Sequence, residues 1–216
     1  MKRLAASVCA VGVFLLMGAG QAAGSITLGQ LATAPNGCVA NIDWVEPAVS
    51  SGVVPYVVPS GYGTITSWST QAFGPSGAAL TLKIFRPTSA ALTFAAVAHD
   101  GPHTLNSPGL NTFPVNIAVQ PGDLIGLHAG TGAPTCSGVA GSDPAYTRAG
   151  DLQDGQQGGP FSPLNNRLLN VKAEVAPTVT GQRGSALKGC KKRAHKKHWS
   201  HKRLKKCKKK AQLLPI

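Results

Sequence analysis

The chain has 216 residues, of which 43% are hydrophobic and 13% are charged, and its formal net charge is +13 at pH 7. Residues 24–180 have a net charge of −3, because five Lys and Arg residues stand against eight carboxylates, whereas residues 181–216 have a net charge of +14 and no acidic residue. The positive charge is therefore concentrated in the C-terminal tail, which excludes a protein that is basic along its whole length. The first region is long enough for one hydrophobic core, but the tail has too few apolar residues to fold by burial alone.

The N-terminus has the pattern of a secretory signal peptide. Met1-Lys-Arg precedes an apolar run from Leu4 to Met17, and small residues follow up to Gly24. The run is shorter than the ~20 residues that a membrane-spanning helix needs. We therefore expect residues 1–23 to be removed, and the mature chain to be secreted, extracellular or in the cell envelope, with no transmembrane segment.

Residues 24–176 read as an all-β region. Short segments rich in Val, Ile, Leu and Thr alternate with clusters of Gly, Pro, Asn and Ser. The predicted strands are 25–32, 38–46, 53–58, 62–70, 78–86, 91–98, 112–119, 123–129 and 167–175. The alternation of Leu80, Leu82 and Ile84 with polar neighbours predicts strands with one buried and one wet face. We expect an antiparallel two-sheet sandwich that is jelly-roll-like, because the Cys…Trp…Cys pattern of an immunoglobulin core is missing.

Residues 111–127 give the strongest local signal in this region. Phe113, Val115, Ile117 and Val119 alternate with small or polar residues, and Pro121-Gly122 then favours a type II turn. The pattern predicts a β-hairpin. The following stretch, 130–163, is dense in Gly, Pro, Asp and Gln, so we expect a long irregular excursion, of the kind that often carries binding residues.

Four cysteines remain after Cys9 is removed with the signal peptide, an even number in a compartment that permits disulfides. Three pairings are open. The pairing of Cys38 with Cys136 and of Cys190 with Cys207 is favoured, because a break in composition separates the two sets.

A linker at residues 177–185 leads to the basic tail, 186–216, which contains an internal repeat. Leu187-Lys-Gly-Cys190-Lys-Lys-Arg-Ala194 recurs as Leu204-Lys-Lys-Cys207-Lys-Lys-Lys-Ala211. In each copy Leu, Cys and Ala fall on one stripe of a helix. Folding back at His198-Trp-Ser200 brings the stripes together, so we expect a short disulfide-stapled helical hairpin. The residues expected to bind polyanions are Lys191, Lys192, Arg193, Lys196, Lys197, Lys202, Arg203, Lys205, Lys206, Lys208, Lys209 and Lys210.

The segments 53–68, 80–87, 119–126 and 169–175 resemble the secreted β-sandwich domains of actinobacterial surface and extracellular proteins. They read Val53-Val-Pro-Tyr-Val-Val-Pro-Ser-Gly-Tyr-Gly-Thr-Ile-Thr-Ser-Trp68, Leu80-Thr-Leu-Lys-Ile-Phe-Arg-Pro87, Val119-Gln-Pro-Gly-Asp-Leu-Ile-Gly126 and Leu169-Asn-Val-Lys-Ala-Glu-Val175. The Lys-rich, Cys-containing tail is similar to tails found in such bacteria. The resemblance implies an exported protein and brings no catalytic residues with it.

The candidates for chemistry are few. His99, Asp100, His103 and His128 could converge on a metal, but they do not follow the cupin pattern, and we expect a local turn instead. His195, His198 and His201 with Cys190 and Cys207 match no standard zinc finger, and we expect the disulfide.

An enzyme is not expected either. No serine lies in a nucleophile elbow, and the only glutamates, Glu46 and Glu174, are expected at exposed positions, where they would not flank a cleft. The sequence thus predicts no catalytic residues, metal or cofactor.

Tyr62, Trp68 and Tyr146 are the aromatic residues that could contact a ligand. Tyr62 and Trp68 are expected on one face of a strand, where they could stack on a sugar, although a tryptophan is more often buried.

The function indicated is that of an exported, non-enzymatic binding or structural protein whose cationic tail adheres to polyanions of the envelope. The alternative is a carbohydrate-binding or carbohydrate-active jelly roll. No base-reading module indicates sequence-specific nucleic-acid binding.

Overall fold

The computed structural model describes residues 24–33, 35–47, 54–73, 76–131, 134–139, 144–178 and 182–212. The predicted signal peptide lies outside the described residues. The strands and helices are β1 (Ile26–Gln30), β2 (Pro35–Gly37), β3 (Ile42–Val45), β4 (Tyr62–Ala72), β5 (Ala79–Pro87), β6 (Phe94–Thr104), β7 (Gly109–Ala118), β8 (Leu124–Ala129), β9 (Thr135–Gly138), β10 (Ala145–Ala149), β11 (Gln157–Gly158), β12 (Ser162–Leu164), β13 (Leu168–Leu169), β14 (Val171–Pro177), α1 (Gln182–Lys196) and α2 (His201–Gln212).

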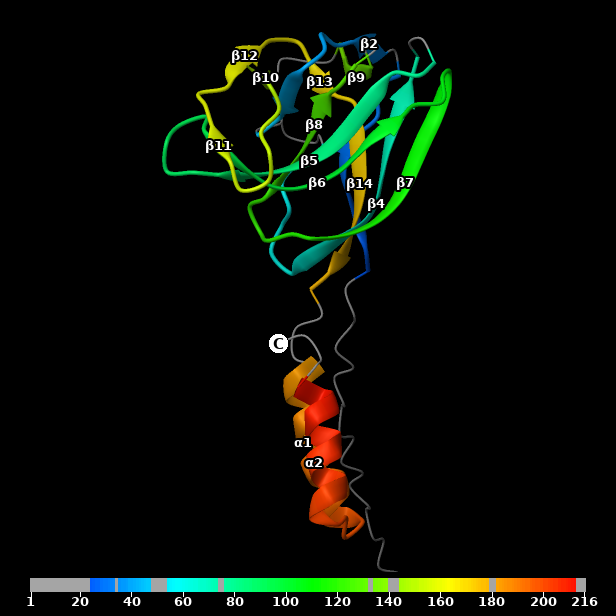
Figure 1. Ribbon diagram of the computed structural model, residues 1–216, viewed down its shortest axis with the longest axis vertical. Helices are drawn as coiled ribbons and strands as arrows, with labels where there is room; N and C mark the ends of the chain where they lie inside the picture. The colour runs from blue at the N-terminus through cyan, green and yellow to red at the C-terminus, as the bar shows by residue number, and fades with distance from the viewer. Residues whose placement is uncertain are drawn as a thin grey trace, which may run out of the picture.

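Two antiparallel sheets make up most of the β region, by which we mean residues 24–178. The order is β1-β14-β4-β7 in a four-stranded sheet and β11-β6-β5-β8-β3-β10-β12 in a seven-stranded sheet, and β13-β9-β2 form a third, small sheet. Figure 1 shows the β region at one end of the molecule and the two helices at the other. The expectation of an all-β region with antiparallel sheets is confirmed.

The main core contains the inward-facing side chains of both large sheets. Leu80, Leu82 and Ile84 of β5 belong to the same buried cluster as Ile65 and Trp68 of β4. This follows from the two-residue period of a strand, which sends alternate side chains to opposite faces.

The outward-facing side chains of β5 are also buried, contrary to the expectation of one wet face. Thr81 is 5% exposed and Lys83 is 2% exposed. A second apolar cluster on this side includes Phe85, Phe94 and Phe161. The rings of Phe94 and Phe161 meet edge to face with their centroids 5.1 Å apart, a favourable aromatic geometry. Residues 151–161, which we call the covering segment, therefore cover this face of the sheet.

The strands β7 and β8 form where the sequence predicts them, but they are not a hairpin. The turn is present: Gly122 has φ 91°, and the Asp123 N–H donates to the Gln120 carbonyl at 3.0 Å. However, β7 pairs with β4, whereas β8 pairs with β3 and β5. The turn thus carries the chain from one sheet to the other, so the predicted hairpin is wrong.

Two other local expectations differ from the structure. Within the predicted strand 53–58, residues 54–58 contain only an isolated bridge from Val57 to Leu124. The stretch 130–163 is less irregular than expected, because β9, β10 and β11 lie in it. These strands have only two to five residues, so the sequence pattern that would predict them is weak.

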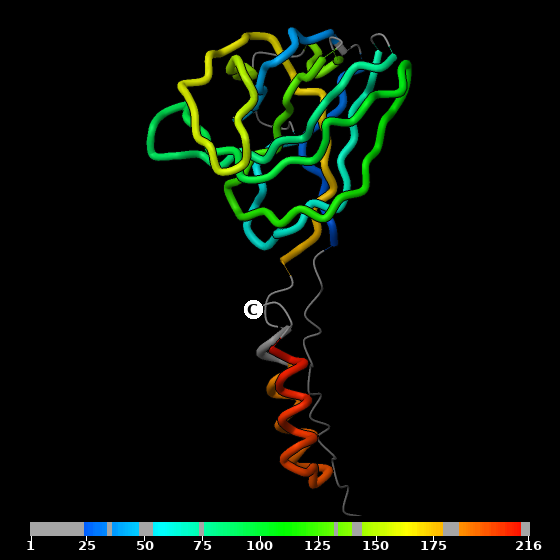
Figure 2. Tube along the Cα trace, viewed as in Figure 1, coloured from blue at the N-terminus to red at the C-terminus, as the bar shows by residue number. Residues whose placement is uncertain are grey.

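The tail contains two helices that contact each other and are joined through residues 197–200. The helix α1 begins at Gln182, inside the predicted linker. In Figure 2 the β region begins with β1 and ends with β14 on the same side, and the helices extend from that side. None of the described helices is both long and apolar enough to cross a membrane.

Candidate functional site

The helix pair, which we define as α1, α2 and the residues joining them, carries the densest charge of the molecule. Residues 186–212 contain thirteen Lys and Arg residues and no Asp or Glu. All of these cationic residues are exposed except Lys208, which is half-buried. The residues predicted to bind polyanions thus lie on the two helices and on the turn that joins them, and all but the half-buried Lys208 are exposed.

The apolar residues of the repeat hold the two helices together. Cys190 is 2% exposed and Ala211 is 3% exposed, while Leu187, Ala194 and Leu204 are half-buried. Cys190 and Cys207 form a disulfide across the pair, with their α-carbons 5.9 Å apart. The stripe of Leu, Cys and Ala is therefore used for packing, which leaves the lysines on the remaining faces.

The cations of the helix pair have no acidic partner among the described residues. The ion pairs found there all join side chains of the β region. Within the helix pair, Arg193 donates to its own helix at the Gly189 carbonyl, and Arg203 lies over the ring of Trp199 at 4.7 Å from its centroid. The positive charge is thus available to an external anion.

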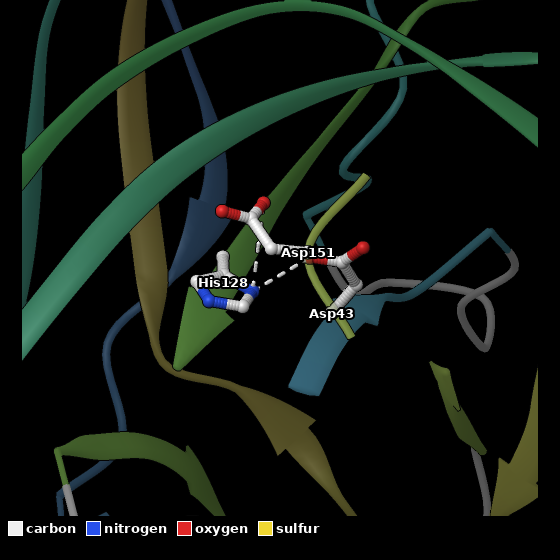
Figure 3. Close-up of side chains that lie close together, drawn as sticks. All are labelled: Asp43, His128 and Asp151. Atoms are coloured by element: carbon white, nitrogen blue, oxygen red, sulfur yellow. Dashed lines mark hydrogen bonds and ion pairs between the residues drawn. The ribbon is translucent and has the colours of Figure 1, made fainter. Parts of the chain in front are cut away.

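A polar cluster lies on the outer face of the seven-stranded sheet (Figure 3). His128 Nδ1 lies 2.9 Å from Asp43 Oδ1 and 3.8 Å from Asp151 Oδ1. Because a carboxylate oxygen accepts only, Nδ1 carries the proton that is donated to Asp43. Asp43 and His128 stand opposite each other on β3 and β8, and Asp151 comes from the segment that covers the sheet.

Lys83 and Arg148 balance the charges of this cluster. Lys83 Nζ is 2.6 Å from Asp151 Oδ1 and donates to the Leu152 carbonyl at 2.8 Å. Arg148 lies 4.0 Å from Asp43 Oδ2, which also accepts the Leu152 N–H at 2.9 Å. Burial raises the pKa of Asp151, but the hydrogen bond from Lys83 and the charges of His128 and Lys83 outweigh it, so this pKa lies below its usual value.

Among the described residues, ligands for a cation come together in this cluster and not in the group of His99, Asp100, His103 and His128 considered from the sequence. Asp43, His128 and Asp151 offer three ligand atoms within 4.8 Å of one another. A divalent ion would have to compete with the Lys83 ammonium for Asp151 and with the Leu152 N–H for Asp43. We therefore interpret the cluster as an ion-paired network that fixes the covering segment to the sheet.

The structure separates the residues that the sequence grouped as candidate metal ligands. His99 pairs with Asp154 at 2.9 Å, whereas Asp100 accepts from Trp68 and contacts His103, each at 2.7 Å. His99 and Asp100 are neighbours in a strand and point to opposite faces. His128 lies in the cluster described above.

The expected aromatic surface is not formed either. Trp68 is fully buried and contacts Phe113 with its ring tilted by 39° and the ring centroids 4.7 Å apart. Tyr62 and Tyr146 are half-buried and pack against the two apolar clusters. They lie on β4 and β10, which belong to different sheets. A register shift between Ile65 and Ser67 changes the facing of β4, which is why Tyr62 and Trp68 do not share an exposed face.

Glu46 is buried, contrary to the expectation of an exposed position. It is 2% exposed and accepts the Leu169 N–H at 2.8 Å. Tyr56 donates to the Leu169 carbonyl at 2.6 Å, and burial together with the charge of Glu46 raises the pKa of this phenol. Glu46 thus serves the packing of β13.

Both expected disulfides are present. Cys38 pairs with Cys136 over a separation of 98 residues, and Cys190 pairs with Cys207 over a separation of 17. Two disulfides fit an extracellular protein, because thiols in the cytosol are kept reduced.

Comparisons with protein families, curated proteins and solved structures find no match for this chain.

Proposed function

We propose that the protein is exported and acts as a non-enzymatic binding protein, in which the helix pair attaches the β region to polyanions of the cell envelope. The observation that carries this proposal is the set of thirteen cationic residues in 186–212 with no acidic residue among them. So many like charges repel one another, and a bound anionic polymer reduces this repulsion. Binding also releases the counterions of the polymer, which favours the complex. The N-terminal signal pattern and the resemblance to secreted actinobacterial domains support the location.

The helix pair acts in this proposal as a rigid basic helical hairpin. The disulfide between Cys190 and Cys207 and the packed stripe limit how far the helices separate. Rigid cations lose less conformational entropy on binding than those of a loose chain, which favours affinity.

We also propose that the β region is a jelly roll that serves as the carried module. Its main strands in chain order are β1, β3, β4, β5, β6, β7, β8 and β14. The first of these pairs with the last, β3 pairs with β8, β4 with β7, and β5 with β6. Such nested pairing results when one long antiparallel ribbon is rolled into two sheets, which is the jelly-roll arrangement.

The test compares full chains that begin at Gly24 and differ only in charge. In one variant Lys202, Lys205, Lys206, Lys209 and Lys210 are replaced by Gln, which keeps helix propensity. In a control variant Arg167 and Lys172 of the β region are replaced by Gln. We expect the first variant to lose retention on immobilised poly(glycerol phosphate), and the control to keep it.

Salt provides the second readout. Retention of the unaltered chain should collapse between low and physiological salt, because binding through many phosphates is strongly salt-dependent. Retention that survives both the Lys→Gln changes and high salt contradicts the proposal. Such retention on cell-wall glycan would instead support the alternative of a carbohydrate-binding β region.

A further inference from the structure

The helix pair has a cavity of about 230 Å³ along one flank of α2, lined by Trp199, Arg203, Lys206, Cys207 and Lys210. Successive lining residues are three or four positions apart, except for the adjacent Lys206 and Cys207, so they lie along one side of α2 and the turn before it. The cavity thus combines an aromatic ring and three cations in one place.

Trp199 is fixed at the turn between the helices. Its backbone N–H donates to the Ala194 carbonyl at 3.0 Å, and the Arg203 guanidinium covers the ring at 4.7 Å from its centroid. Its indole Nε1 is buried and has no hydrogen-bond partner. Because this atom is closed to solvent, a ligand in the cavity would meet the carbon atoms of the ring and not the N–H.

The lining selects among polyanions. Lys206 and Lys210 have no acidic partner in the described chain and suit a phosphate, whereas the indole and the Cys207 sulfur are apolar and gain nothing from a bare chain of phosphates. A pyranose ring offers an apolar C–H face that can pack on the carbon atoms of the indole.

Nucleic acid fits this surface less well. Binding of single strands uses successive aromatic platforms for successive bases, and Trp199 is the only Trp, Tyr or Phe residue in 181–216.

We propose that this cavity binds a sugar bearing a phosphate, with the phosphate between Lys206 and Lys210 and the sugar against Trp199. The inference rests on the proposed polyanion binding and narrows its ligand to phosphate-containing glycans.

A second cavity on the same helix provides a matched control. It has about 240 Å³ and is lined by His201, Leu204, Lys205 and Lys208, with no tryptophan. The double variant K205A/K208A therefore removes the same charge from the same helix as K206A/K210A, but it leaves the Trp199 cavity intact.

The experiment measures dissociation constants of the full chain from Gly24 for three probes with equal numbers of phosphates. They are an oligosaccharide of hexose units joined by phosphodiesters, linear inorganic polyphosphate and a single-stranded oligonucleotide. Trp199→Leu should raise the dissociation constant of the oligosaccharide about tenfold, as expected for a lost ring contact. It should raise that of polyphosphate less than about twofold. Trp199→Phe, which keeps a smaller aromatic ring, should weaken binding of the oligosaccharide less than Trp199→Leu does.

Two further readouts support this comparison. K206A/K210A should weaken binding of the oligosaccharide more than K205A/K208A does. The two double variants should weaken binding of polyphosphate equally. Trp44 and Trp68 are buried in the β region, at 4% and 0% exposure, so a change of tryptophan emission on adding the oligosaccharide reports on Trp199. Far-UV circular dichroism confirms that each variant retains its helices.

The outcomes separate this inference from the proposed function. If the unaltered chain binds none of the probes, the proposed function fails, and the inference fails with it. If the chain binds polyanions but Trp199→Leu weakens all probes equally or none, only the inference is overturned. Preference for the oligonucleotide over the oligosaccharide overturns it as well.

Discussion

Asp43 and Asp154 each lie 2.9 Å from a histidine nitrogen, in His128 and His99 respectively. Their surroundings differ. The Asp43 side chain is 0% exposed and also accepts the Leu152 N–H, whereas that of Asp154 is 43% exposed. An exposed ion pair contributes little because water solvates both partners, but removal of one member of a buried network leaves the others without a partner.

We therefore expect Asp43→Ala to destabilise the protein by about 2 to 4 kcal/mol. Two donors lose their acceptor in this variant, the His128 Nδ1–H and the Leu152 N–H. Asp154→Ala is the matched control and should cost less than about 1 kcal/mol. Urea unfolding followed by fluorescence measures both. Equal losses would show that the buried network has no special role.

The network around Asp43 could not be predicted from the sequence. Lys83 reads as the polar position of an amphipathic strand, and only the segment that folds over the sheet buries it. Asp43 and Asp151 are 108 residues apart, and no spacing rule connects them. From the sequence, Trp68 could either contact a ligand or be buried. A register shift that no local pattern reveals places it in the core.

At the scale of the element, local signals predict local structure well. The turn at Pro121-Gly122 forms because its two residues suit the required dihedral angles. The repeat in the tail predicts both helices, their stripe and their disulfide, since all of these lie within residues 182–212. By contrast, the partners of β7 and β8 depend on strands far away in the sequence, and for that reason the predicted hairpin is wrong.

The helices of the tail should depend on their crosslink. They have 15 and 12 residues, which is marginal for isolated helices in water, and their lysines repel one another. The disulfide closes a short loop, which is worth about 3 kcal/mol on the chain-entropy model. We expect an oxidised peptide of residues 184–216 to show more helix by circular dichroism than the reduced peptide, in dilute buffer and with a polyanion. Equal helix content in both forms, under both conditions, would indicate a disordered polycation.

At the scale of the whole molecule, the β region and the helix pair have separate means of stabilisation. The hydrogen bonds and the disulfide of residues 186–212 remain within the tail. The β region has its own core and its own disulfide, whose cysteines are 4% and 0% exposed. The opposite charges of the two parts, read from composition, mark the same division.

We accordingly expect the two disulfides to stabilise different parts of the chain. Cys38→Ala with Cys136→Ala should lower the free energy of unfolding of the β region by about 4 kcal/mol, because a loop of 98 residues is opened. Cys190→Ala with Cys207→Ala should change it by less than about 0.5 kcal/mol, although the tail loses helix.

The measurement is urea unfolding in a Trp199→Phe background, where the remaining tryptophans, Trp44 and Trp68, report on the β region alone. Far-UV circular dichroism follows the helices in the same samples. The two double cysteine variants could shift the urea midpoint of the tryptophan signal equally. That result would show that the helices stabilise the β region. That result would mean that a polyanion held by the tail also stabilises the β region, since binding to the folded helix pair would then be linked to its unfolding equilibrium. With independent parts, binding leaves the tryptophan transition unchanged, and the tail acts as an anchor only.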